Sequence, residues 1–347
     1  MRLRIAVAGA GTIGRRHIEL IRENGDCELA AIVDPAPSAL AYARDTGVPL
    51  HKTLADLFAA ERPDGVIAAT PNSLHVQNGV DCVVHGVPVL IEKPVADSVA
   101  DAMRLIDAAE RTKVPVLIGH HRRHSPILEK AREIVQGGTL GRIVAVMGSA
   151  MFHKPDSYFS EGPWRREPGG GPILINMIHE VDDLRSMCGE IVEVQALASN
   201  AARGFAVEDT VAINLRFASG ALGTFVLSDT AATARSWEQT SGENTRYASY
   251  PDEDCYVIAG NSGSLAVPTM RLKVYSGERS WWKPFDTSVV AVQRADPLSR
   301  QLAHFCAVLR GDVAPLVSAR DALQTLRVTL AIDEAARSGR PTATIAA

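Results

Sequence analysis

The sequence has little that would suit a secreted, membrane-spanning or nucleic-acid-binding protein. Its five cysteines are Cys27, Cys82, Cys188, Cys255 and Cys306. They are scattered without a CxxC pair, and their odd number argues against a disulfide framework. No uninterrupted apolar run approaches the roughly 18 residues of a membrane span. The formal net charge of -4 provides no basic field for nucleic acid. We therefore expect a cytoplasmic protein with no nucleic-acid and no membrane partner.

The composition is that of a globular protein with enough apolar material for a core. Of the 347 residues, 46% are apolar and 22% are charged. At roughly 150 residues per domain, this length predicts two domains. We place their boundary where the residue pattern changes, which gives domains at residues 1–122 and 123–347.

In the first domain, short apolar runs alternate with helical patterns. We expect strands at residues 5–8, 29–33, 66–69, 89–91 and 116–118, and helices near residues 13–24, 37–45, 73–85 and 97–111. Apolar strands that alternate with helices are typical of a parallel sheet covered on both faces. The first domain is therefore predicted to be a doubly wound α/β domain of the Rossmann type. Asp97 is a candidate N-cap, and Gly25 and Gly47 are candidate C-cap residues.

The residue pattern of the second domain differs, because several strands follow one another without helices between them. We expect strands near residues 142–150, 191–199, 210–217, 221–227, 255–259 and 264–267, and helices near residues 126–136, 172–187, 297–310 and 319–338. Consecutive strands of this kind predict an α+β domain with an open, mostly antiparallel sheet. The polar region 228–254 has no pattern that assigns its structure.

A glycine motif of the dinucleotide-binding type follows the first expected strand. Gly9, Gly11 and Gly14 form G-x-G-x-x-G, with Thr12 and Ile13 opening the next helix. The glycines allow a tight turn, a close approach of pyrophosphate and helix packing on the strand. The helix N-terminus offers N–H groups to the phosphates. Glycine turns are common in α/β proteins, but here a strand and a helix flank the motif as binding requires.

Asp34 stands at the end of the second expected strand, 20 residues after Gly14. A carboxylate at this place holds the ribose hydroxyls and repels a 2′-phosphate. We therefore expect NAD as the cofactor, with NADP less favoured. The alternative is that Asp34 is a turn residue before Pro35.

Several further motifs make the sequence resemble one oxidoreductase family. They are Thr70-Pro71-Asn72 with His75, Glu92-Lys93-Pro94, Gly119 to Arg123 with Pro126, Trp164-Arg165, Gly169-Gly170-Gly171, His179 with Asp182, and Asp321 with Asp333-Glu334. Together with the glycine motif, they resemble the Gfo/Idh/MocA family, which includes glucose–fructose oxidoreductase and inositol dehydrogenase. The resemblance covers nearly the whole chain.

The resemblance implies an enzyme that acts on a small molecule. It implies a substrate held between the two domains over the nicotinamide, typically a sugar, a cyclitol or a derivative. It also implies that the open sheet mediates contacts in a homodimer or homotetramer. On the cofactor side it places Thr70, Pro71, Asn72, His75, Glu92 and Lys93.

Lys93 and His179 are the candidate catalytic residues. Hydride transfer from an alcohol needs a base for the hydroxyl proton, and the reverse reaction needs an acid. Lys93 lies at the end of a strand beside the expected nicotinamide, where burial and the positive ring would lower its pKa. His179 is placed to donate to the substrate oxygen. Without the resemblance, a surface lysine paired with Glu92 would be an equally good interpretation of Lys93, and a structural histidine would be the usual interpretation of His179.

Asn176, His179 and Asp183 have helical spacing and are expected to share one face, with Asn176 and Asp183 binding substrate. The family often has an aspartate four residues before the histidine, where this chain has Ile175. Asparagine cannot act as a base, although it can bond a hydroxyl. A three-residue Lys–Asp–His set is therefore not expected, whereas a Lys93–His179 pair is.

Basic residues gather at the expected domain junction, in His120-His121-Arg122-Arg123-His124. We assign Arg122 to the cofactor, and Arg123, Trp164 and Arg165 to the substrate. With Arg166, these arginines suggest a phosphate or a substrate carboxylate, and hence a sugar acid. No metal is expected, because no acidic or cysteine ligands accompany the histidines.

Three functions remain open on the sequence. The first is an NAD(P)-dependent dehydrogenase or reductase acting on a secondary alcohol or ketone. The second is a glycoside hydrolase of the same family that uses tightly held NAD. The third is a non-catalytic dinucleotide-binding sensor, which the replacement of the aspartate by Ile175 keeps open.

Overall fold

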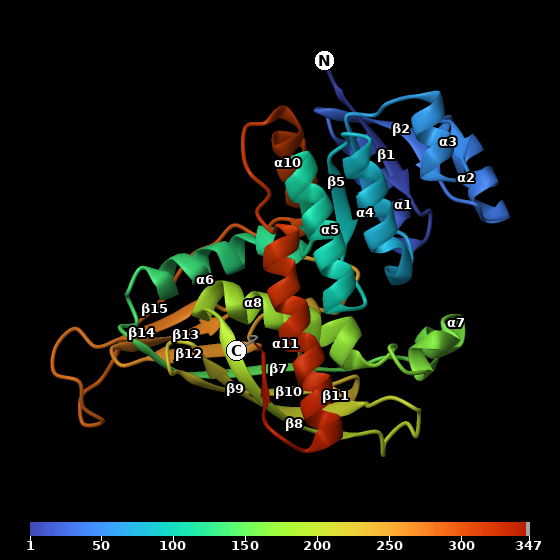
Figure 1. Cartoon of the computed structure of the whole chain (residues 1–347). Coiled ribbons are helices and arrows are strands. Elements are labelled where there is room, and N and C mark those ends of the chain that lie inside the picture. Colours follow the sequence, from blue (N-terminus) through green and yellow to red (C-terminus); the bar gives the residue numbers. More distant parts are fainter. Residues whose placement is uncertain (345–347) are drawn as a thin grey trace. The chain divides into compact units, whose positions relative to one another are not determined.

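A computed structural model describes residues 1–344 (Figure 1). The chain forms two compact units. Unit 1 consists of residues 1–121 and 297–326, and unit 2 of residues 122–296 and 327–347, of which residues 122–296 and 327–344 are described. No helix within residues 1–344 is long and apolar enough to cross a membrane.

Unit 1 is built on a six-stranded parallel sheet. Its strands are β1 (Leu3–Ala8), β2 (Cys27–Val33), β3 (Leu50–His51), β4 (Gly65–Ala68), β5 (Val89–Glu92) and β6 (Val116–Gly119). They lie in the order β3-β2-β1-β4-β5-β6, and every neighbouring pair is parallel. This is the Rossmann order, with its switch point between β1 and β4. The predicted doubly wound fold is thus confirmed.

The helices of unit 1 are α1 (Thr12–Glu23), α2 (Pro37–Thr46), α3 (Leu54–Ala60), α4 (His75–Val84), α5 (Val99–Thr112) and α10 (Pro297–Arg310), with a short turn η1 (Asn72–Leu74). Gly47 caps α2 in the left-handed conformation, as expected. Two expected caps are wrong by one residue: Ser98 caps α5 in place of Asp97, and Asn24 is the C-cap residue of α1 in place of Gly25. The serine prevails because its side chain accepts from the N–H of Asp101.

Helix α10 packs within unit 1, although the sequence placed it in the second domain. It buries Leu302, Phe305 and Cys306 there. Gly65, at the start of β4, contacts α10 so closely that a β-carbon would lie 3.0 Å from the ring of Phe305. The N–H of Ile118 in β6 also donates to the carbonyl of Val317 at 2.9 Å. These contacts join residues far apart in the sequence, so no local pattern indicated them.

Unit 2 is built on a ten-stranded mixed sheet. Its strands are β7 (Ile143–His153), β8 (Ile191–Ser199), β9 (Thr210–Phe217), β10 (Leu222–Ser228), β11 (Thr230–Arg235), β12 (Tyr256–Gly260), β13 (Gly263–Val267), β14 (Arg271–Val274), β15 (Asp286–Val289) and β16 (Thr342–Ala343). The main order is β15-β14-β13-β12-β7-β10-β9-β8-β16, and β11 pairs with β7. Among the described strands of this second sheet, only β10 and β7 pair in parallel, so the mostly antiparallel sheet is confirmed.

The helical elements of unit 2 are η2 (His121–His124, from Arg122 onward), α6 (Pro126–Gln136), α7 (Asp156–Glu161), η3 (Pro163–Arg166), a π-helical turn η4 (Ile173–Met177), α8 (Ile178–Cys188), α9 (Trp237–Thr240) and the second part of α11 (Ala319–Ser338). Apolar side chains of α6, α8 and α11 form one core with the inner face of the sheet. The outer face carries exposed apolar side chains, namely Met147, Leu197, Leu222 and Val226.

Several elements had no clear sequence signal. Strand β3 has two residues and helix α3 has seven, which is too short for a repeating pattern to identify either. The region 228–254 contains β11 and α9, which are short and polar. Strand β14 alternates polar and apolar residues over only four positions, and β15 is exposed along its whole length with one apolar residue.

Candidate dinucleotide and substrate sites

The glycine loop of unit 1 has backbone contacts that only glycine permits at two of its three glycine positions. Gly9 has φ of +95°, and a β-carbon there would lie 2.4 Å from the carbonyl oxygen of Ala69. A β-carbon on Gly14 would lie 1.9 Å from the carbonyl oxygen of Gly9. A β-carbon on Gly11 would meet nothing within 4 Å. The loop is therefore closely packed on the protein side and open at Gly11, as close approach of a pyrophosphate requires.

The N-terminus of α1 supplies the matching donors. Gly11 is the N-cap residue and offers no side-chain cap, so the first N–H groups of the helix, from Thr12 onward, meet no capping side chain. Asp34 follows β2, and its carboxylate accepts from the N–H of Ala10 at 2.7 Å and of Ala36 at 2.8 Å. Asp34 is thereby fixed beside the glycine loop. These residues fit a dinucleotide.

The segment after β4 is held together by His75. One ring nitrogen of His75 lies 2.9 Å from the carbonyl oxygen of Thr70, and the other lies 2.7 Å from that of Pro94. Thr70 also accepts from the side chain of Asn78 at 2.8 Å. His75 is buried, so the structure assigns it to tying two loops together and not to contact with the cofactor. Pro71 and Asn72 are exposed on the same segment.

Lys93 follows β5 directly, so it lies at the carboxyl edge of the sheet with the glycine loop and Thr70. Its neighbour Glu92 is buried, and the Glu92 carboxylate lies 2.8 Å from Nε2 of His17 on α1. Burial alone would raise the pKa of Glu92, but the His17 hydrogen bond, with the charges of His17, His121 and Lys93, lowers it. Glu92 is thus a buried carboxylate fixed by α1, which positions the half-buried Lys93 beside it.

In unit 2, the triple glycine lets the chain turn closely before η4. A β-carbon on Gly170 would lie 2.2 Å from the carbonyl oxygen of Trp164, and one on Gly171 would lie 2.4 Å from the carboxylate of Glu208. The π-helical turn η4 follows and carries Ile175 and Asn176. Such turns are rare and occur frequently at functional sites. His179 is the second residue of the α8 helix that continues the turn.

The side chain of Asn176 is in contact with Lys154, which lies just after β7. Nζ of Lys154 donates to Oδ1 of Asn176 at 2.7 Å. The ammonium also lies 4.8 Å from the ring centre of Tyr158. The guanidinium of Arg165 lies 3.8 Å from the same ring and 5.4 Å from the ring of Trp164. Three residues predicted to bind substrate, Asn176, Trp164 and Arg165, are thus gathered around Lys154 and Tyr158.

Lys154 and Tyr158 were not among the residues predicted to form the site. Both lie in the polar, aromatic stretch that follows β7, and neither belongs to a motif. A lysine directly after a long strand and before a proline was the one available signal. Burial lowers the pKa of Lys154 to about 8; Asp229 and Glu238 oppose this shift, and Arg165 adds to it.

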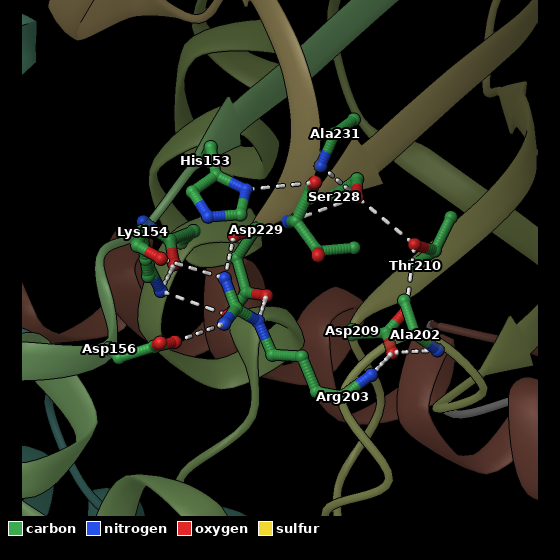
Figure 2. A network of polar contacts seen from close by, with 12 residues as sticks. His153, Lys154, Asp156, Ala202, Arg203, Asp209, Thr210, Ser228, Asp229 and Ala231 are labelled. Carbon is green, nitrogen blue, oxygen red and sulfur yellow. Dashed lines mark hydrogen bonds and ion pairs between the residues drawn. The ribbon is translucent and has the colours of Figure 1, made fainter.

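A polar network holds Lys154 in place (Figure 2). Arg203, from the loop between β8 and β9, donates from Nε to Asp229 at 2.9 Å and from Nη2 to the carbonyl oxygen of Lys154 at 2.9 Å. The N–H of Lys154 donates to the carbonyl of Asp229, also at 2.9 Å. Asp209 supports the loop by accepting from the N–H groups of Ala202 and Arg203. The end of β7 is therefore joined to two neighbouring loops.

Arg122 and Asp183 have a different place from the one predicted. Arg122 is buried, and its guanidinium donates to Glu180 at 2.7 Å, to Asp183 at 3.2 Å and to Glu238 at 2.5 Å. Tyr256 donates to Glu180 and to Asp183. We name Arg122, Glu180, Asp183, Glu238 and Tyr256 the Arg122 cluster. The assignments of Arg122 to the cofactor and of Asp183 to the substrate are therefore wrong, because ion pairs inside unit 2 engage both side chains.

The Arg122 cluster places several acids around one cation, and burial is the largest influence on the pKa values of Glu180 and Asp183. Burial raises the pKa of Glu180 and of Asp183, and the nearby Arg122 charge opposes both shifts. Arg123, the neighbour of Arg122, pairs with Asp182 at 3.3 Å. Both arginines of the basic segment therefore face acids of α8, which the sequence pattern did not predict.

The Rossmann order, the glycine loop and the carboxylate after β2 define a dinucleotide-binding α/β protein. Residues 3–120 match the model of the oxidoreductase family GFO_IDH_MocA, NAD-binding Rossmann fold. Residues 128–266 match the GFO/IDH/MocA C-terminal domain. The chain belongs to the Gfo/Idh/MocA family of NAD-dependent oxidoreductases, as the motifs predicted.

Named relatives are dehydrogenases and reductases. The chain is 27% identical over 341 residues to 1,5-anhydro-D-fructose reductase of Ensifer adhaerens, covering 97% of each chain. It is 32% identical over 189 residues to rhizopine catabolism protein MocA of Rhizobium meliloti, which is 54% of this chain and 58% of that protein. Among solved structures, the WlbA dehydrogenase of Bordetella pertussis, in complex with NADH and UDP-GlcNAcA, superposes with a TM-score of 0.80 at 25% identity, covering 100% of each chain.

Proposed function

We propose that the protein transfers hydride between nicotinamide and a secondary alcohol or ketone of a sugar, cyclitol or sugar acid. The observation that carries this proposal is the place of Lys93. It directly follows β5, at the same carboxyl edge of the sheet as the glycine loop, and Glu92 fixes the chain beside it. Relatives named as reductases and dehydrogenases of sugars and cyclitols support the substrate class.

In this proposal the chain's own residues move the proton. NAD supplies the hydride acceptor when it is bound. Lys93 takes the hydroxyl proton of the substrate, or returns it in the reverse direction. In unit 2, His179 and Asn176 hydrogen-bond substrate hydroxyls. Glu92 contributes by position, because the His17 contact holds its carboxylate inside the protein.

We propose NAD in preference to NADP. The carboxylate of Asp34 is fixed by two backbone N–H groups beside the glycine loop, where it would meet the ribose hydroxyls and repel a 2′-phosphate. A related structure contains NADH, which agrees with this choice. Titration of the protein with NAD and NADP tests it, and tighter binding of NADP would refute it.

We also propose a homodimer or homotetramer joined through the outer face of the unit 2 sheet. Met147, Leu197 and Leu222 are more than half exposed on that face. An exposed apolar face of this kind marks a protein interface. Sedimentation of the wild type and of a Met147→Lys, Leu222→Lys double variant tests this, since the variant is expected to be monomeric.

The experiment that tests the enzyme function follows NADH absorbance near 340 nm across sugars, cyclitols and sugar acids. Wild type is expected to accumulate NADH with one substrate class, and Lys93→Ala to lose turnover by at least 100-fold while it still binds NAD. Lys52→Ala, another lysine of unit 1, is the control and should keep full activity. Release of free sugar without NADH would favour a hydrolase. A Lys93→Ala variant with unchanged turnover would refute the proposed role.

A further inference from the structure

Two buried cations in unit 2 share a single buried carboxylate. The side chains of Lys154 and Arg203 are 9% and 7% exposed, and that of Asp229 is 3% exposed. Asp229 pairs with Arg203 at 2.9 Å and with Lys154 at 3.6 Å. Asp156 lies 3.8 Å from Arg203 but is fully exposed, so water screens it. Buried charges are normally paired. Asp229 therefore balances one of these two charges and leaves the other, whereas the second buried acid of the network, Asp209, accepts from the backbone N–H groups of Ala202 and Arg203.

The contacts of Lys154 show where that charge is directed. An ammonium group donates three hydrogen bonds and accepts none. Asn176 takes one N–H at 2.7 Å, and Asp229 is the nearest acid for a second. The rings of Phe152 and Tyr158 lie farther from the ammonium, with their centres at 5.6 Å and 4.8 Å, and we assign the third N–H to a ligand.

Lys154 also determines how Asn176 presents its amide. Because the ammonium is only a donor, the amide oxygen of Asn176 must face it. The amide NH₂ of Asn176 is therefore the end left to contact a ligand, as a donor. A donor amide, a donor ammonium and the guanidinium of Arg165 beside Tyr158 form a set of donors around one place. Such a set suits an anionic oxygen.

We propose that Lys154, with the amide NH₂ of Asn176, binds a carboxylate of the substrate, so that this enzyme selects acidic over neutral sugars and polyols. This inference rests on the proposed function, which places the substrate over Asn176 and His179. Ile175 agrees with it, because an aspartate at that position would add a negative charge beside the carboxylate. The sequence pattern suggested arginines, among them Arg123 and Arg165, for a substrate carboxylate, and we now give the central part of this role to Lys154.

The charged groups around Lys154 make binding depend on pH in a defined way. They are Asp229 and Glu238, which stabilise the ammonium, and Arg165, which opposes it. Arg203 and Asp156 complete the network around the end of β7. With its pKa at about 8, Lys154 is mostly charged at pH 7 and mostly neutral at pH 9. Affinity for an acid is therefore expected to fall about tenfold between these values, and affinity for a neutral sugar to stay unchanged.

The test compares three matched pairs of probes: D-glucuronate with D-glucose, D-galacturonate with D-galactose, and L-tartrate with L-threitol. NAD reduction is measured for wild type, Lys154→Met and Lys154→Arg. Wild type is expected to prefer at least one acid over its neutral partner by tenfold or more in kcat/KM. Lys154→Met should raise KM for that acid at least tenfold and leave the neutral partner within threefold. Lys154→Arg should retain the preference without the loss between pH 7 and 9.

A second readout does not depend on turnover. The chain has seven lysines, so the ¹³Cε resonance of Lys154 is assigned by its loss in Lys154→Met. Binding of the preferred acid should raise the pKa of Lys154 by at least one unit, since a tenfold preference for the charged form is one pKa unit. The neutral partner should leave it unchanged. Lys130→Met, an exposed lysine of α6 paired with Glu133, is the control for both measurements.

The outcomes separate this inference from the proposed function. Oxidation of neutral probes with no effect of any acid on Lys154 would keep the dehydrogenase and overturn the carboxylate site. A shift of Lys154 by acids without NADH formation would keep the site and overturn the dehydrogenase. Equal losses for acid and neutral probes in Lys154→Met would show that Lys154 only supports the turn η4, which also overturns the inference.

Discussion

Replacement of Glu243 by glutamine should remove a pH-dependent term from the stability of unit 2. The Glu243 carboxylate accepts from the hydroxyl of Ser125 at 2.5 Å and is largely buried. Burial raises the pKa of Glu243 from 4.5 to about 7, against hydrogen bonds from Ser125 and Trp237 and the charges of Arg122 and Arg294. Between these two pKa values the folded state binds more protons than the unfolded state. The free energy of unfolding therefore falls as pH rises.

The size of the effect follows from the two pKa values. Each pH unit over which folded and unfolded states differ by one proton is worth about 1.4 kcal/mol. From pH 5 to pH 8, Glu243 should cost the wild type about 2 kcal/mol, after allowance for the part of the carboxyl that reaches water. Glutamine keeps the acceptor for Ser125 and does not titrate. The stability of the variant relative to wild type should therefore rise by that amount over the same range.

The assay is urea unfolding at pH 5 and pH 8, followed by tryptophan fluorescence. Trp164, Trp237, Trp281 and Trp282 are the four tryptophans of the chain, and all lie in unit 2. Fluorescence therefore reports the unfolding of the unit that contains Glu243. Glu161→Gln removes an exposed carboxylate of α7 and is the control. Linkage predicts that the difference in free energy of unfolding between wild type and Glu243→Gln changes by about 2 kcal/mol from pH 5 to pH 8. A change of less than about 0.5 kcal/mol would refute the reasoning.

Two further substitutions test the packing of each unit. Gly14→Ala should weaken NAD binding at least tenfold, because its β-carbon would lie 1.9 Å from the carbonyl oxygen of Gly9. Calorimetric titration with NAD measures this loss. Gly25→Ala is the control and should bind NAD normally, because its β-carbon would meet nothing within 4 Å. Arg122→Met should lower the free energy of unfolding of unit 2 by about 3–5 kcal/mol, because it leaves buried carboxylates without their cation. The exposed Arg216→Met, measured by the same fluorescence, should change it by less than about 1 kcal/mol.

The parts of the fold that sequence predicted well are those with local signals. Strands β4, β5 and β6 of unit 1 are buried along their whole length, so their apolar residue pattern alone identifies them. The turn at Gly9 to Gly14 depends on residues within one short segment, and its contacts agree with the glycine motif. Lys93 could be placed because it ends an apolar strand.

The parts that sequence predicted poorly depend on partners far along the chain. Arg122 has its ion pairs with residues 58, 61 and 116 positions away, so the basic segment alone suggested a ligand instead. Lys154 meets Asn176 and Asp229 only because strand β7 ends beside both of their segments. Charge type indicates that an arginine or lysine has a partner, but only the fold decides which partner it has.

The division of the chain has a consequence for how the protein forms during synthesis. Unit 1 needs residues 297–326, which bury Phe305 and cover β6 through Val317. A ribosome that has released residues 1–121 has therefore released an incomplete nucleotide-binding sheet. That sheet must wait until the 175 residues from 122 to 296 have emerged before α10 can close it. Until then, nascent unit 1 exposes the side of β4 near Gly65. Loss of α10 would therefore leave this unit prone to aggregation.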